Sequence, residues 1–240
     1  MYIEGKNPVA EALRSGVTIN RVWVQNNIND NATNQIIKLA KQNKIRLDFV
    51  DKKILDNKSQ TKHHQGIMCE TVDFSYSEVE DILALAQEKN EAPFIVILDG
   101  IEDPHNFGAI IRSAECAGVH GIIIPEYRAC QVNETVIKTS AGATANMLIA
   151  KVTNLNNCIE KLQKNNVWVY GLELGGESIY KTNLKGAVAL VVGSEGFGIS
   201  KLTKQKCDQI VALPMNGKIN SLNASVACGI ALYEILKQRD

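Results

Sequence analysis

Apolar runs alternate with amphipathic stretches over most of this chain. In the larger, C-terminal part the mainly apolar runs have the length of buried strands and lie at 94–98, 121–124, 147–152, 167–172, 187–192 and 209–213. Stretches with helical spacing lie between them, near 104–117, 134–140, 155–165 and 224–237. Strands that are apolar throughout are typically buried on both faces. Their alternation with helices therefore predicts an α/β domain with a mainly parallel sheet.

The N-terminal part has shorter elements. Its helical patterns lie near 8–14 and 32–43, and its apolar strands lie at 22–24, 46–50 and 67–72. These elements predict a small α/β unit. Residues 75–92 are polar and acidic, typical of a surface helix or a linker, and they end at Pro93. We therefore expect a small domain over 1–74, a linker over 75–92 and a larger domain over 93–240.

Composition bounds the class of protein. With 240 residues, 45% of them apolar and 22% charged, the chain is long enough for one or two domains. Its six cysteines form no C-x-x-C pair, and Cys69, Cys116 and Cys228 stand among apolar or small residues. This pattern predicts buried thiols in a reducing compartment rather than a disulfide scaffold or a zinc site. Because no run of 18 apolar residues and no signal-peptide pattern occur, we expect a cytoplasmic protein.

The net charge of zero hides an uneven distribution. Residues 1–72 carry 11 lysines and arginines against 7 acidic residues, 73–92 carry 1 against 6, and 93–240 carry 14 against 13. If the protein binds a polyanion, the mildly basic first part is the better electrostatic candidate. Such a small excess is also typical of an ordinary solvated surface, so charge alone does not predict a nucleic-acid ligand.

A glycine-rich segment follows the apolar strand at 187–192. Its spacing over 193–198 is G-x-x-G-x-G, which differs from the G-x-G-x-x-G dinucleotide fingerprint, and the chain contains no G-x-x-x-x-G-K-[ST] phosphate loop. Nucleotide phosphates are therefore disfavoured as ligands, and tight turn geometry alone would account for the glycines. Glu195 adds an ionisable side chain at the carboxyl end of a buried strand, where α/β proteins build their sites.

A predicted helix start carries two further polar side chains. Asp103 and Pro104 have the residue types of an N-cap and a first helical position. Asn106 and Arg112 follow, six positions apart, so they do not share one helix face cleanly unless Asn106 lies at the cap or before it.

The last predicted helix begins in a similar way. Asn223 has the residue type of its N-cap, with Ser221 and Ser225 on either side. The helix then carries small residues that would let another helix approach closely, namely Ala224, Ala227, Cys228, Gly229 and Ala231. This smooth face suits either a tight core or a subunit interface.

The usual nucleophilic and metal-binding patterns do not occur. The chain has no G-x-S-x-G elbow, no H-E-x-x-H, no EF-hand loop and no Cys/His cluster. His63 and His64 precede a strand of the basic part, a position typical of a surface turn or of contact with an RNA backbone. His105 stands beside Asn106, where we expect it to position a loop.

Three separate segments together match a known family. They are D-P-H-N-F-G-A-I-I-R-S-A at 103–114, V-V-G-S-E-G-F-G-I at 191–199, and I-V-A-L-P-M with S-L-N-A-S-V-A within 210–227. In this order they closely resemble the three motifs of the SpoU-type (TrmH-like) RNA ribose 2′-O-methyltransferases of the SPOUT class. Two N-terminal segments, G-K-N-P-V-A-E-A-L at 5–13 and H-Q-G-I at 64–67, resemble the ribosomal-protein-L30-like (L30e-like) substrate-binding domain of many members. The resemblance therefore covers nearly the whole chain.

The resemblance implies a fold, a cofactor and an assembly. It implies a deep trefoil knot in the SPOUT-type C-terminal part, which periodicity alone does not predict because knots are rare. It implies S-adenosylmethionine as the methyl donor, held by Gly193, Leu213 and Leu222, and no metal. An adenosine needs apolar walls and main-chain hydrogen bonds rather than a phosphate loop, in agreement with the motifs above. It also implies a homodimer that completes the site, with the last helix at the interface.

The resemblance assigns the reaction to five polar residues: Asn106, Arg112, Glu195, Ser221 and Asn223. A ribose 2′-hydroxyl is a weak acid, so its proton must leave as it attacks the methyl group. The family assigns this activation to Arg112, with Asn106 orienting Arg112 or the RNA. Because a guanidinium is a poor proton acceptor, we expect Arg112 to stabilise the developing alkoxide and grip a phosphate, while phosphate or water takes the proton. Glu195 is expected to orient Arg112 or the cofactor loop, and Ser221 and Asn223 to line the pocket.

The N-terminal resemblance favours a guanosine of 23S ribosomal RNA as the substrate. Members that methylate transfer RNA, and thiostrepton-resistance methyltransferases, share the catalytic motifs, so transfer RNA stays an alternative. A non-catalytic RNA-binding or ribosome-assembly protein is another, although a pure binder has no need of all five polar groups together. A nicotinamide or nucleotide-phosphate enzyme is disfavoured by the missing fingerprints. We expect neither a membrane nor DNA as a partner.

Overall fold

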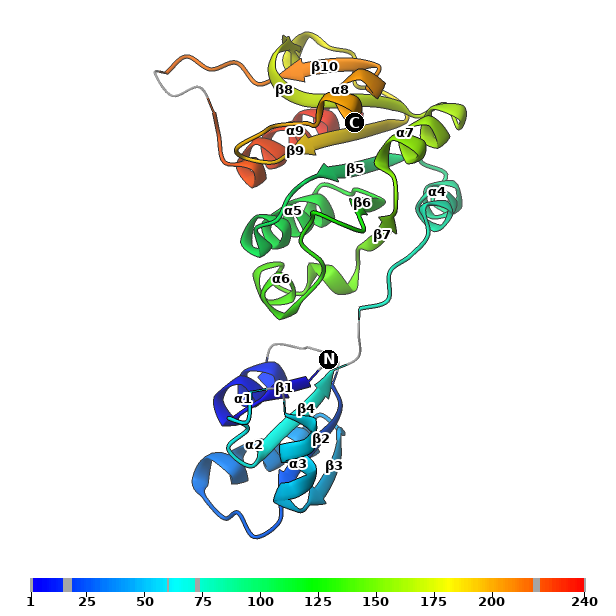
Figure 1. The fold of residues 1–240 in the computed structure, drawn as a ribbon. Helices are drawn as coiled ribbons and strands as arrows, with labels where there is room; N and C mark the ends of the chain where they lie inside the picture. The colour runs from blue at the N-terminus through cyan, green and yellow to red at the C-terminus, as the bar shows by residue number, and fades with distance from the viewer. Residues whose placement is uncertain (1, 15–18, 60, 72–73, 218–220, 240) are drawn as a thin grey trace. The chain divides into compact units, whose positions relative to one another are not determined.

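A computed structural model describes residues 2–14, 19–59, 61–71, 74–217 and 221–239 of the protein. The chain divides into two compact units, Met1–Ser75 and Tyr76–Asp240. Each unit has its own β-sheet, as Figure 1 shows. None of the helices among the described residues is long and apolar enough to cross a bilayer.

The first unit is a four-stranded mixed sheet in the order β1-β4-β2-β3. Its elements are β1 (Tyr2–Glu4), α1 (Lys6–Arg14), β2 (Ile19–Gln25), α2 (Asn31–Gln42), β3 (Arg46–Val50), α3 (Lys52–Lys58) and β4 (Ile67–Thr71). β4 pairs antiparallel with β1 and β2, whereas β2 and β3 are parallel. The pattern did not predict β1 or α3, because such short elements give little periodic signal. Val72, the predicted end of the last strand, lies outside the described residues.

Helices cover both faces of the first sheet. Val9 of α1 and Ile36 of α2 are buried in one cluster with the apolar side chains of β2 and β4. Leu55 of α3 packs on the opposite face against Trp23 and Met68. Because successive side chains of a strand point to opposite faces, neighbouring residues of β2 and β4 serve the two cores.

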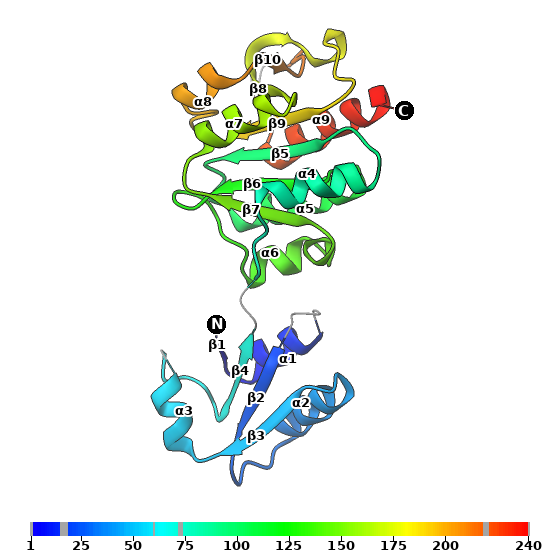
Figure 2. The ribbon, with the colours of Figure 1, turned by 90° about the vertical axis from the view of Figure 1, so that its right-hand side faces the viewer.

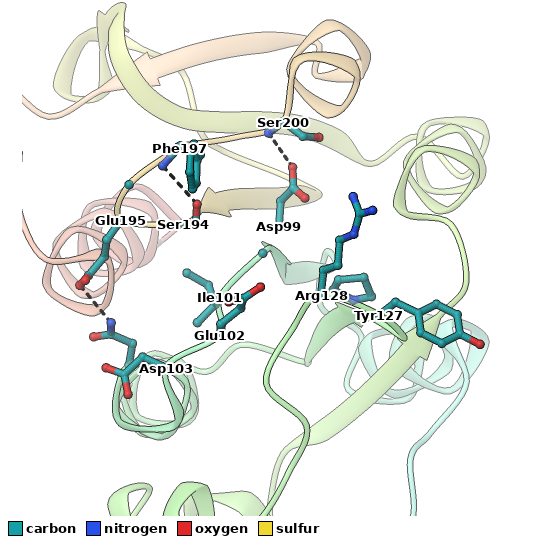
Figure 3. Close-up of a pocket in the computed structure, with 15 residues that line it drawn as sticks. Asp99, Ile101, Glu102, Asp103, Tyr127, Arg128, Ser194, Glu195, Phe197 and Ser200 are labelled. Atoms are coloured by element: carbon teal, nitrogen blue, oxygen red, sulfur yellow. Dashed lines mark hydrogen bonds between the residues drawn. The ribbon is translucent and has the colours of Figure 1, made fainter.

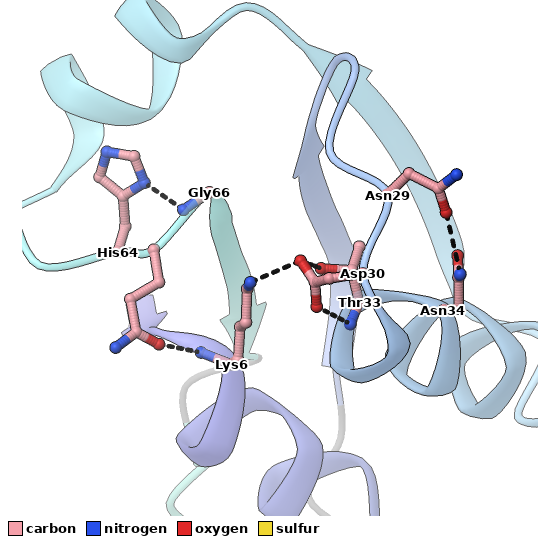
Figure 4. Close-up of polar contacts among 8 residues, drawn as sticks. Lys6, Asn29, Asp30, Thr33, Asn34, His64 and Gly66 are labelled. Atoms are coloured by element: carbon pink, nitrogen blue, oxygen red, sulfur yellow. Dashed lines mark hydrogen bonds and ion pairs between the residues drawn. The ribbon is translucent and has the colours of Figure 1, made fainter.

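A polar contact joins the starts of α1 and α2 (Figure 4). The Lys6 ammonium lies 2.6 Å from the Asp30 carboxylate, and the other Asp30 oxygen accepts a hydrogen bond from the Thr33 amide at 3.0 Å. Asp30 is therefore the N-cap of α2. The hydrogen bonds from Lys6 and Thr33 hold the pKa of Asp30 at about 2. We call Lys6, Asp30 and Thr33 the first-unit cluster.

His64 is buried in the first unit, so the expectation that it lies in a surface turn is wrong. Its side chain is 3% exposed. Nδ1 accepts a hydrogen bond from the Gly66 amide at 2.9 Å, and Nε2 lies 2.9 Å from an Asp56 oxygen. Both ring nitrogens therefore have a hydrogen-bond partner, so the polar imidazole can be buried without an unpaired polar atom.

The second unit is a six-stranded sheet in the order β10-β8-β9-β5-β6-β7, in which every pairing is parallel. Its elements are α4 (Val79–Glu88), β5 (Phe94–Asp99), α5 (Pro104–Cys116), β6 (Gly121–Pro125), α6 (Glu134–Thr139), η1 (Ala143–Ala145), β7 (Leu148–Val152), α7 (Leu155–Lys164), β8 (Trp168–Ser178), η2 (Ile179–Lys181), β9 (Val188–Gly193), α8 (Lys201–Lys206), β10 (Gln209–Ala212) and α9 (Ala224–Arg239). The predicted α/β class with a parallel sheet is confirmed, whereas the short α8 was not predicted. The trefoil knot stays a prediction.

Two helical layers sandwich this sheet. Figures 1 and 2 show α4 and α7 on one face and α5, α6 and α9 on the other. Ile82 of α4 and Ile159 of α7 are fully buried against the first face. Phe107 of α5 and Leu232 of α9 are buried on the second face. Burial on both faces is the physical reason for the uninterrupted apolar strands seen in the sequence.

The segment predicted as a linker, 75–92, differs from that expectation. It contains α4, which belongs to the second unit and buries Val79, Ile82 and Ala86. Gly121 of β6 lets the helix approach, because a Cβ there would lie 2.5 Å from atoms of Ile82. The apolar stripe is narrow, and the whole segment carries five acidic residues against one lysine, so its sequence resembles a solvated connector.

The small residues of α9 pack inside the second unit. Cys228 and Ala231 are fully buried, and α9 lies against α5. Burial raises the pKa of the Cys228 thiol to about 12. The sequence left open whether this face forms a tight core or a subunit interface, and the structure shows a tight core. Because Cys228 and Ala231 are buried within one chain, their expected role at an interface is not supported. The exposed face of α9 carries larger apolar side chains instead, namely Val226, Ile230 and Tyr233.

The cysteines show a second difference from expectation. Cys69 and Cys228 are buried as predicted, but Cys116 is exposed at the end of α5. Cys116 lies two positions beyond the buried Ala114, on the outer side of the helix. Neighbouring small residues in the sequence did not distinguish these two sides.

Candidate functional site

The start of α5 lies at the carboxyl end of β5, where parallel sheets commonly carry their sites. Asp103 caps the helix, because its Oδ1 accepts a hydrogen bond from the His105 amide at 3.0 Å, and Pro104 follows in the first turn. Both predicted positions are confirmed. Asn106 consequently lies in the first turn of α5, where its side chain is only 6% exposed.

Three polar side chains from distant segments meet at this edge. Oε1 of Glu195 accepts hydrogen bonds from Nδ2 of Asn106 at 3.0 Å and from Nδ2 of Asn223 at 2.5 Å. Asn223 also donates to Oδ1 of Asn106 at 2.8 Å. Figure 3 shows the contact between Glu195 and α5. We call Asn106, Glu195 and Asn223 the edge cluster.

Asn223 joins the edge cluster while it caps α9. Its Oδ1 accepts hydrogen bonds from the amides of Ser225 at 3.0 Å and Val226 at 3.2 Å. Glu195 lies 3.4 Å from the Ala224 amide, so its carboxylate faces the same helix end. The N-terminus of a helix favours negative charge, which helps to stabilise Glu195 here. The capping expectation for Asn223 is confirmed.

Glu195 is positioned by a tight loop after β9. Ser194 and Gly198 exchange backbone hydrogen bonds of 2.9 and 3.1 Å, which close the loop. Gly198 has a φ of +65°, in the left-handed region that favours glycine. A Cβ on Gly193 would lie 2.1 Å from the Gly198 carbonyl carbon, so the loop can fold back only over a glycine.

The loop Ser194–Gly198 separates two cavities. The larger one, of about 570 Å³, is bounded by the loops that follow β5, β6 and β9, and it includes Asn106 and Glu195 (Figure 3). The smaller one, of about 300 Å³, lies on the side of β8 and β10. Glu195 and Phe197 line both cavities.

The smaller cavity contains all three residues for which the sequence predicted cofactor contacts. Gly193, Leu213 and Leu222 line it, together with Ser221. Leu172 and Val192 add further apolar wall. Its ionisable lining groups are Glu195 and Glu173, of which Glu173 forms an ion pair with Lys204 at 2.7 Å, and no lysine or arginine is among the described residues that line it. The cavity is therefore an apolar slot with a negative end.

Arg112 is not part of this arrangement within one chain. Its side chain is exposed on α5 and lines neither cavity. Asn106 and Glu195 bond to each other and to Asn223 instead, so neither orients Arg112 within the chain as expected. Over the residues that the structure describes, Arg112 has no hydrogen-bond or ion-pair partner. The spacing of six residues along α5 is the reason, because it turns the two side chains to different sides.

Other candidate groups at the edge offer no nucleophile or metal site. The described part of the chain holds no group of three His, Cys, Asp or Glu side chains suited to a metal ion. Cys130 follows β6, but burial raises the pKa of its thiol and leaves it a poor nucleophile. His105 is exposed at the start of α5 and contributes its backbone amide to the cap.

Sequence reasoning did not single out four residues of the two cavities. They are Asp99 at the end of β5, Glu102 in the β5–α5 connection, Arg128 in the loop after β6 and Phe197 in the loop after β9. Each follows the carboxyl end of a predicted strand, and that position was the signal available in the sequence. Phe197 stands inside a quoted motif, where an aromatic residue between two glycines is an unusual choice.

The edge cluster is suited to binding and orienting a ligand. Its two amides fix the carboxylate of Glu195, and no lysine or arginine among the described residues forms an ion pair with it. A carboxylate left without a cation at the border of two cavities suits a ligand or partner that brings positive charge. The arrangement can therefore hold a cationic group in one cavity beside a second substrate in the other.

Comparisons with known proteins agree with this geometry. A family model described as the SpoU rRNA Methylase family matches residues 93–233, and one described as RNA 2′-O ribose methyltransferase substrate binding matches residues 2–77. The Bacillus subtilis protein YacO, named for the TrmH family of tRNA/rRNA methyltransferases, is 42% identical over 241 residues, which cover 100% of this chain and 96% of YacO. A Staphylococcus saprophyticus relative with the same family name is 40% identical over 100% of this chain and 96% of its own length.

Solved structures share the fold. The SpoU methyltransferase AviRb from Streptomyces viridochromogenes, in complex with AdoMet, has a TM-score of 0.68 and 20% identity over 99% of this chain and 90% of its own. The AdoMet-bound rRNA methyltransferase from Sinorhizobium meliloti has a TM-score of 0.64 and 22% identity over 98% of this chain and 86% of its own. Both likenesses extend over the first and second units.

Proposed function

Because the chain belongs to the SpoU rRNA methylase family and is an RNA methyltransferase, we propose that it methylates the ribose 2′-hydroxyl of a guanosine in 23S ribosomal RNA, with S-adenosylmethionine as the donor. The position of Glu195 carries this proposal. Its carboxylate has amide partners but no cation, and it stands at the border of two cavities. Ribosomal RNA as the substrate places the reaction in the cytoplasm.

The smaller cavity fits the donor. S-adenosylmethionine supplies, when bound, an electrophilic methyl group on a positively charged sulfur. The apolar walls of the cavity, which include Leu213 and Leu222, suit an adenosine, and the folded-back loop at Gly193 presents backbone groups. The negative end at Glu195, with no lysine or arginine among the described lining residues, suits the sulfonium charge.

The edge cluster positions the ribose. The amide of Asn106 faces the larger cavity, and Ser221 lines the smaller one, so both flank the border where the hydroxyl must meet the methyl group. Asn223 holds the Glu195 carboxylate in place and ties it to the start of α9. Reaction by proximity needs this kind of fixed geometry, because small displacements of reacting atoms cost large factors in rate.

Arg112 provides the positive charge that the reaction needs at the hydroxyl. Its guanidinium stabilises the developing alkoxide and grips the neighbouring phosphate, while the phosphate or a water molecule accepts the proton. Within one chain Arg112 stays away from the edge cluster, exposed and without a partner among the described residues. A second copy of the chain therefore brings its Arg112 to the site.

The exposed face of α9 supports this homodimer. Val226, Ile230 and Tyr233 are 49%, 39% and 52% exposed, and they form an apolar stripe with helical spacing. Apolar side chains gathered on one helix face favour burial against a partner. The stripe starts beside Asn223, so a copy that covers it lies next to the edge cluster.

The first unit supports RNA as the substrate. It carries the basic excess of the chain and matches a substrate-binding family. A unit of this kind selects its RNA through shape or an unpaired loop, because the major groove of double-helical RNA is too deep and narrow for side chains to read. Ribosomal and transfer RNA both offer such loops, so only a mapped product distinguishes them.

The test is methylation of defined RNA. Purified protein is incubated with radiolabelled S-adenosylmethionine and, separately, with unmodified 23S ribosomal RNA and with unmodified transfer RNA, and the labelled ribose is mapped. We expect label on one ribosomal guanosine. Label on transfer RNA alone would keep the reaction and overturn the substrate. Binding of RNA without label in either pool, and without S-adenosylmethionine affinity, would favour a non-catalytic RNA-binding protein.

The homodimer has its own test. Arg112→Ala and Glu195→Gln variants are expected to be inactive alone. When the two are co-expressed, an Arg112 that acts on the partner's site restores one intact site in each mixed dimer. Activity that stays absent in the mixed protein, with both variants folded, would place Arg112 in its own chain's site.

A further inference from the structure

The larger cavity holds three side chains that the proposed reaction leaves without a role: Glu102, Arg128 and Phe197. We infer that this cavity binds the base and an adjacent phosphate of the methylated nucleotide. Phe197 stacks on the base, Glu102 accepts hydrogen bonds from its Watson–Crick edge, and Arg128 pairs with the phosphate. The inference rests on the proposed function, because it places the nucleotide beside the ribose that the edge cluster holds.

The position of the edge cluster indicates which cavity binds the base. Asn106 lines only the larger cavity of the two, whereas Glu195 lines both. A ribose at this border has the apolar slot on one side, which fits the methyl donor, and the larger cavity on the other. With the slot used by the donor, the base of the same nucleotide has only the larger cavity beside it.

Phe197 is presented to solvent by a rigid loop. Its side chain is 97% exposed, and the loop that carries it is closed by the two hydrogen bonds between Ser194 and Gly198. Tyr127 also lines the cavity, but Figure 3 shows its ring directed away from the other lining residues. Phe197 is therefore the aromatic side chain placed to stack on a base. Stacking on an exposed aromatic ring is a common way in which proteins bind an unpaired base.

The carboxylates of the cavity differ in how many of their oxygens are engaged. Asp99 accepts a hydrogen bond from the Ser200 amide at 2.8 Å, and Asp103 accepts one from the His105 amide at 3.0 Å. Glu102 is exposed and has no partner among the described residues, so both of its oxygens are available. It is thus the carboxylate of this cavity that a ligand can engage on two atoms at once.

Arg128 is the cation in the described lining of the larger cavity. Its side chain is exposed, and within the described part of the chain it pairs with no carboxylate. Its φ of +56° lies in the left-handed region, which costs energy for a residue other than glycine. A guanidinium held unpaired beside carboxylates suits a phosphate, whose oxygens it binds on two atoms.

The geometry of Glu102 favours guanine. Two neighbouring donors, N1–H and the N2 amino group, stand on the Watson–Crick edge of guanine, and a carboxylate accepts both. The corresponding edges of adenine, cytosine and uracil each place an acceptor beside the donor, which would face the carboxylate unfavourably. A neutral glutamine at this position would lose most of the preference, because its amide offers only one accepting oxygen.

The first experiment measures nucleotide binding and needs no RNA substrate. Saturation-transfer NMR of the full-length protein with S-adenosylmethionine compares GMP, AMP, IMP and UMP. We expect GMP to bind best, and IMP, which lacks the N2 amino group, to bind about tenfold more weakly. Equal binding of all four nucleotides would overturn the guanine assignment, whether or not any RNA is methylated.

Variants then assign the contacts. Phe197→Leu and Glu102→Gln are each expected to weaken GMP binding about tenfold, whereas Phe197→Tyr keeps the ring and the affinity. Arg128→Ala is expected to weaken GMP but not guanosine, which has no phosphate. Glu88→Gln and Lys164→Ala are matched controls, because both side chains are exposed in the second unit and outside both cavities. If Phe197→Leu binds GMP as the wild type does, the base does not occupy this cavity.

Methylation kinetics separate this inference from the proposed function. On the mapped RNA, Glu102→Gln and Phe197→Leu are each expected to raise KM for RNA about tenfold. Glu102→Gln should leave S-adenosylmethionine affinity unchanged, because Glu102 lines only the larger of the two cavities. If the wild type is active and the variants have the same KM for RNA, the cavity assignment is wrong and the methyltransferase proposal stands. A wild type that methylates no RNA but binds GMP best through these residues would support the cavity assignment and overturn the methyltransferase proposal.

Discussion

The two units each hold a cluster of polar side chains drawn from distant segments, and the clusters differ in charge balance. In the first-unit cluster the Asp30 carboxylate faces the Lys6 ammonium at 2.6 Å and caps α2 (Figure 4). In the edge cluster the Glu195 carboxylate faces only amides, and no lysine or arginine of the described chain pairs with it. The first cluster is complete within the fold, whereas the second leaves a charge for something else to meet.

Charge balance therefore distinguishes polar groups that stabilise the fold from polar groups that await a ligand. A carboxylate with its own cation and cap stabilises local structure, and its pKa falls accordingly, as that of Asp30 does. A carboxylate fixed by neutral partners at a cavity border keeps its charge available for a ligand. Exposure alone would not distinguish the two, because neither carboxylate is deeply buried.

The largest expected effect concerns the missing cation. If Arg112 of a second copy stabilises the alkoxide beside the edge cluster, as proposed, Arg112→Ala should lower the single-turnover methylation rate about 10²- to 10³-fold, the usual range for one transition-state contact. The melting temperature and S-adenosylmethionine affinity should not change, because Arg112 makes no contact with either cavity in the chain. Lys164→Ala is the control for loss of an exposed positive charge. A normal rate for Arg112→Ala would break the comparison between the clusters.

The next effect concerns the loop that holds Glu195. Gly193→Ala places a Cβ 2.1 Å from the Gly198 carbonyl carbon, which forces the loop open. We expect S-adenosylmethionine affinity, measured by calorimetry, to fall about 10- to 100-fold, in line with the cost of strained backbone. Gly196→Ala is the matched control in the same loop, because a Cβ there has open space around it. Equal affinities of the two variants would show that the fold of the loop does not set the cofactor site.

A third change touches only the first unit. Gly66 has a φ of +80°, and a Cβ there would lie 2.0 Å from Cδ1 of Ile28, so Gly66→Ala should destabilise this unit by at least about 1–2 kcal/mol. Urea unfolding followed by Trp23 fluorescence measures this, because Trp23 packs in the core of the first unit. S-adenosylmethionine affinity, a property of the second unit, should stay as in the wild type. A loss of that affinity would show that the two units are coupled.

The smallest effect is a pH dependence of the first-unit cluster. The pKa of Asp30 falls from 3.8 to about 2 in the folded protein. Its contribution to stability is therefore fully present above pH 3.8 and is lost as the pH falls toward 2, because the unfolded state takes up the proton first. The Asp30→Asn variant should lose less of its stability between pH 5 and pH 3 than the wild type. Parallel losses in urea unfolding would mean that the contact with Lys6 is not maintained in solution.

Much of the fold could be predicted from the sequence, for reasons visible in particular elements. β5 and β9 are buried on both faces, and their uninterrupted apolar runs carried that information. Asp103 and Asn223 have cap chemistry that acts within a few residues, so the starts of α5 and α9 were predictable. Short α3 and α8 lacked enough turns to show a period.

The candidate site was predictable in composition but not in contacts. The motifs contained Asn106, Glu195 and Asn223 without any sign that they bond to one another and leave Arg112 apart. Those contacts depend on how loops after different strands converge, which no local pattern encodes. The same holds for Phe197, whose exposure follows from the closure of its loop.

Local sequence patterns predict the class of this protein: a parallel α/β unit, a small basic unit before it, and motifs that resemble one RNA methyltransferase family. They can do so because strand burial, helix caps and motif order are properties of short segments. The folded structure was needed to show that Glu195 lies between two cavities without a cation among the described residues, that Cys228 faces the core, and that α4 belongs to the second unit. These features depend on contacts between residues that lie far apart in the sequence. Such contacts form only when the whole unit is folded and its side chains are packed.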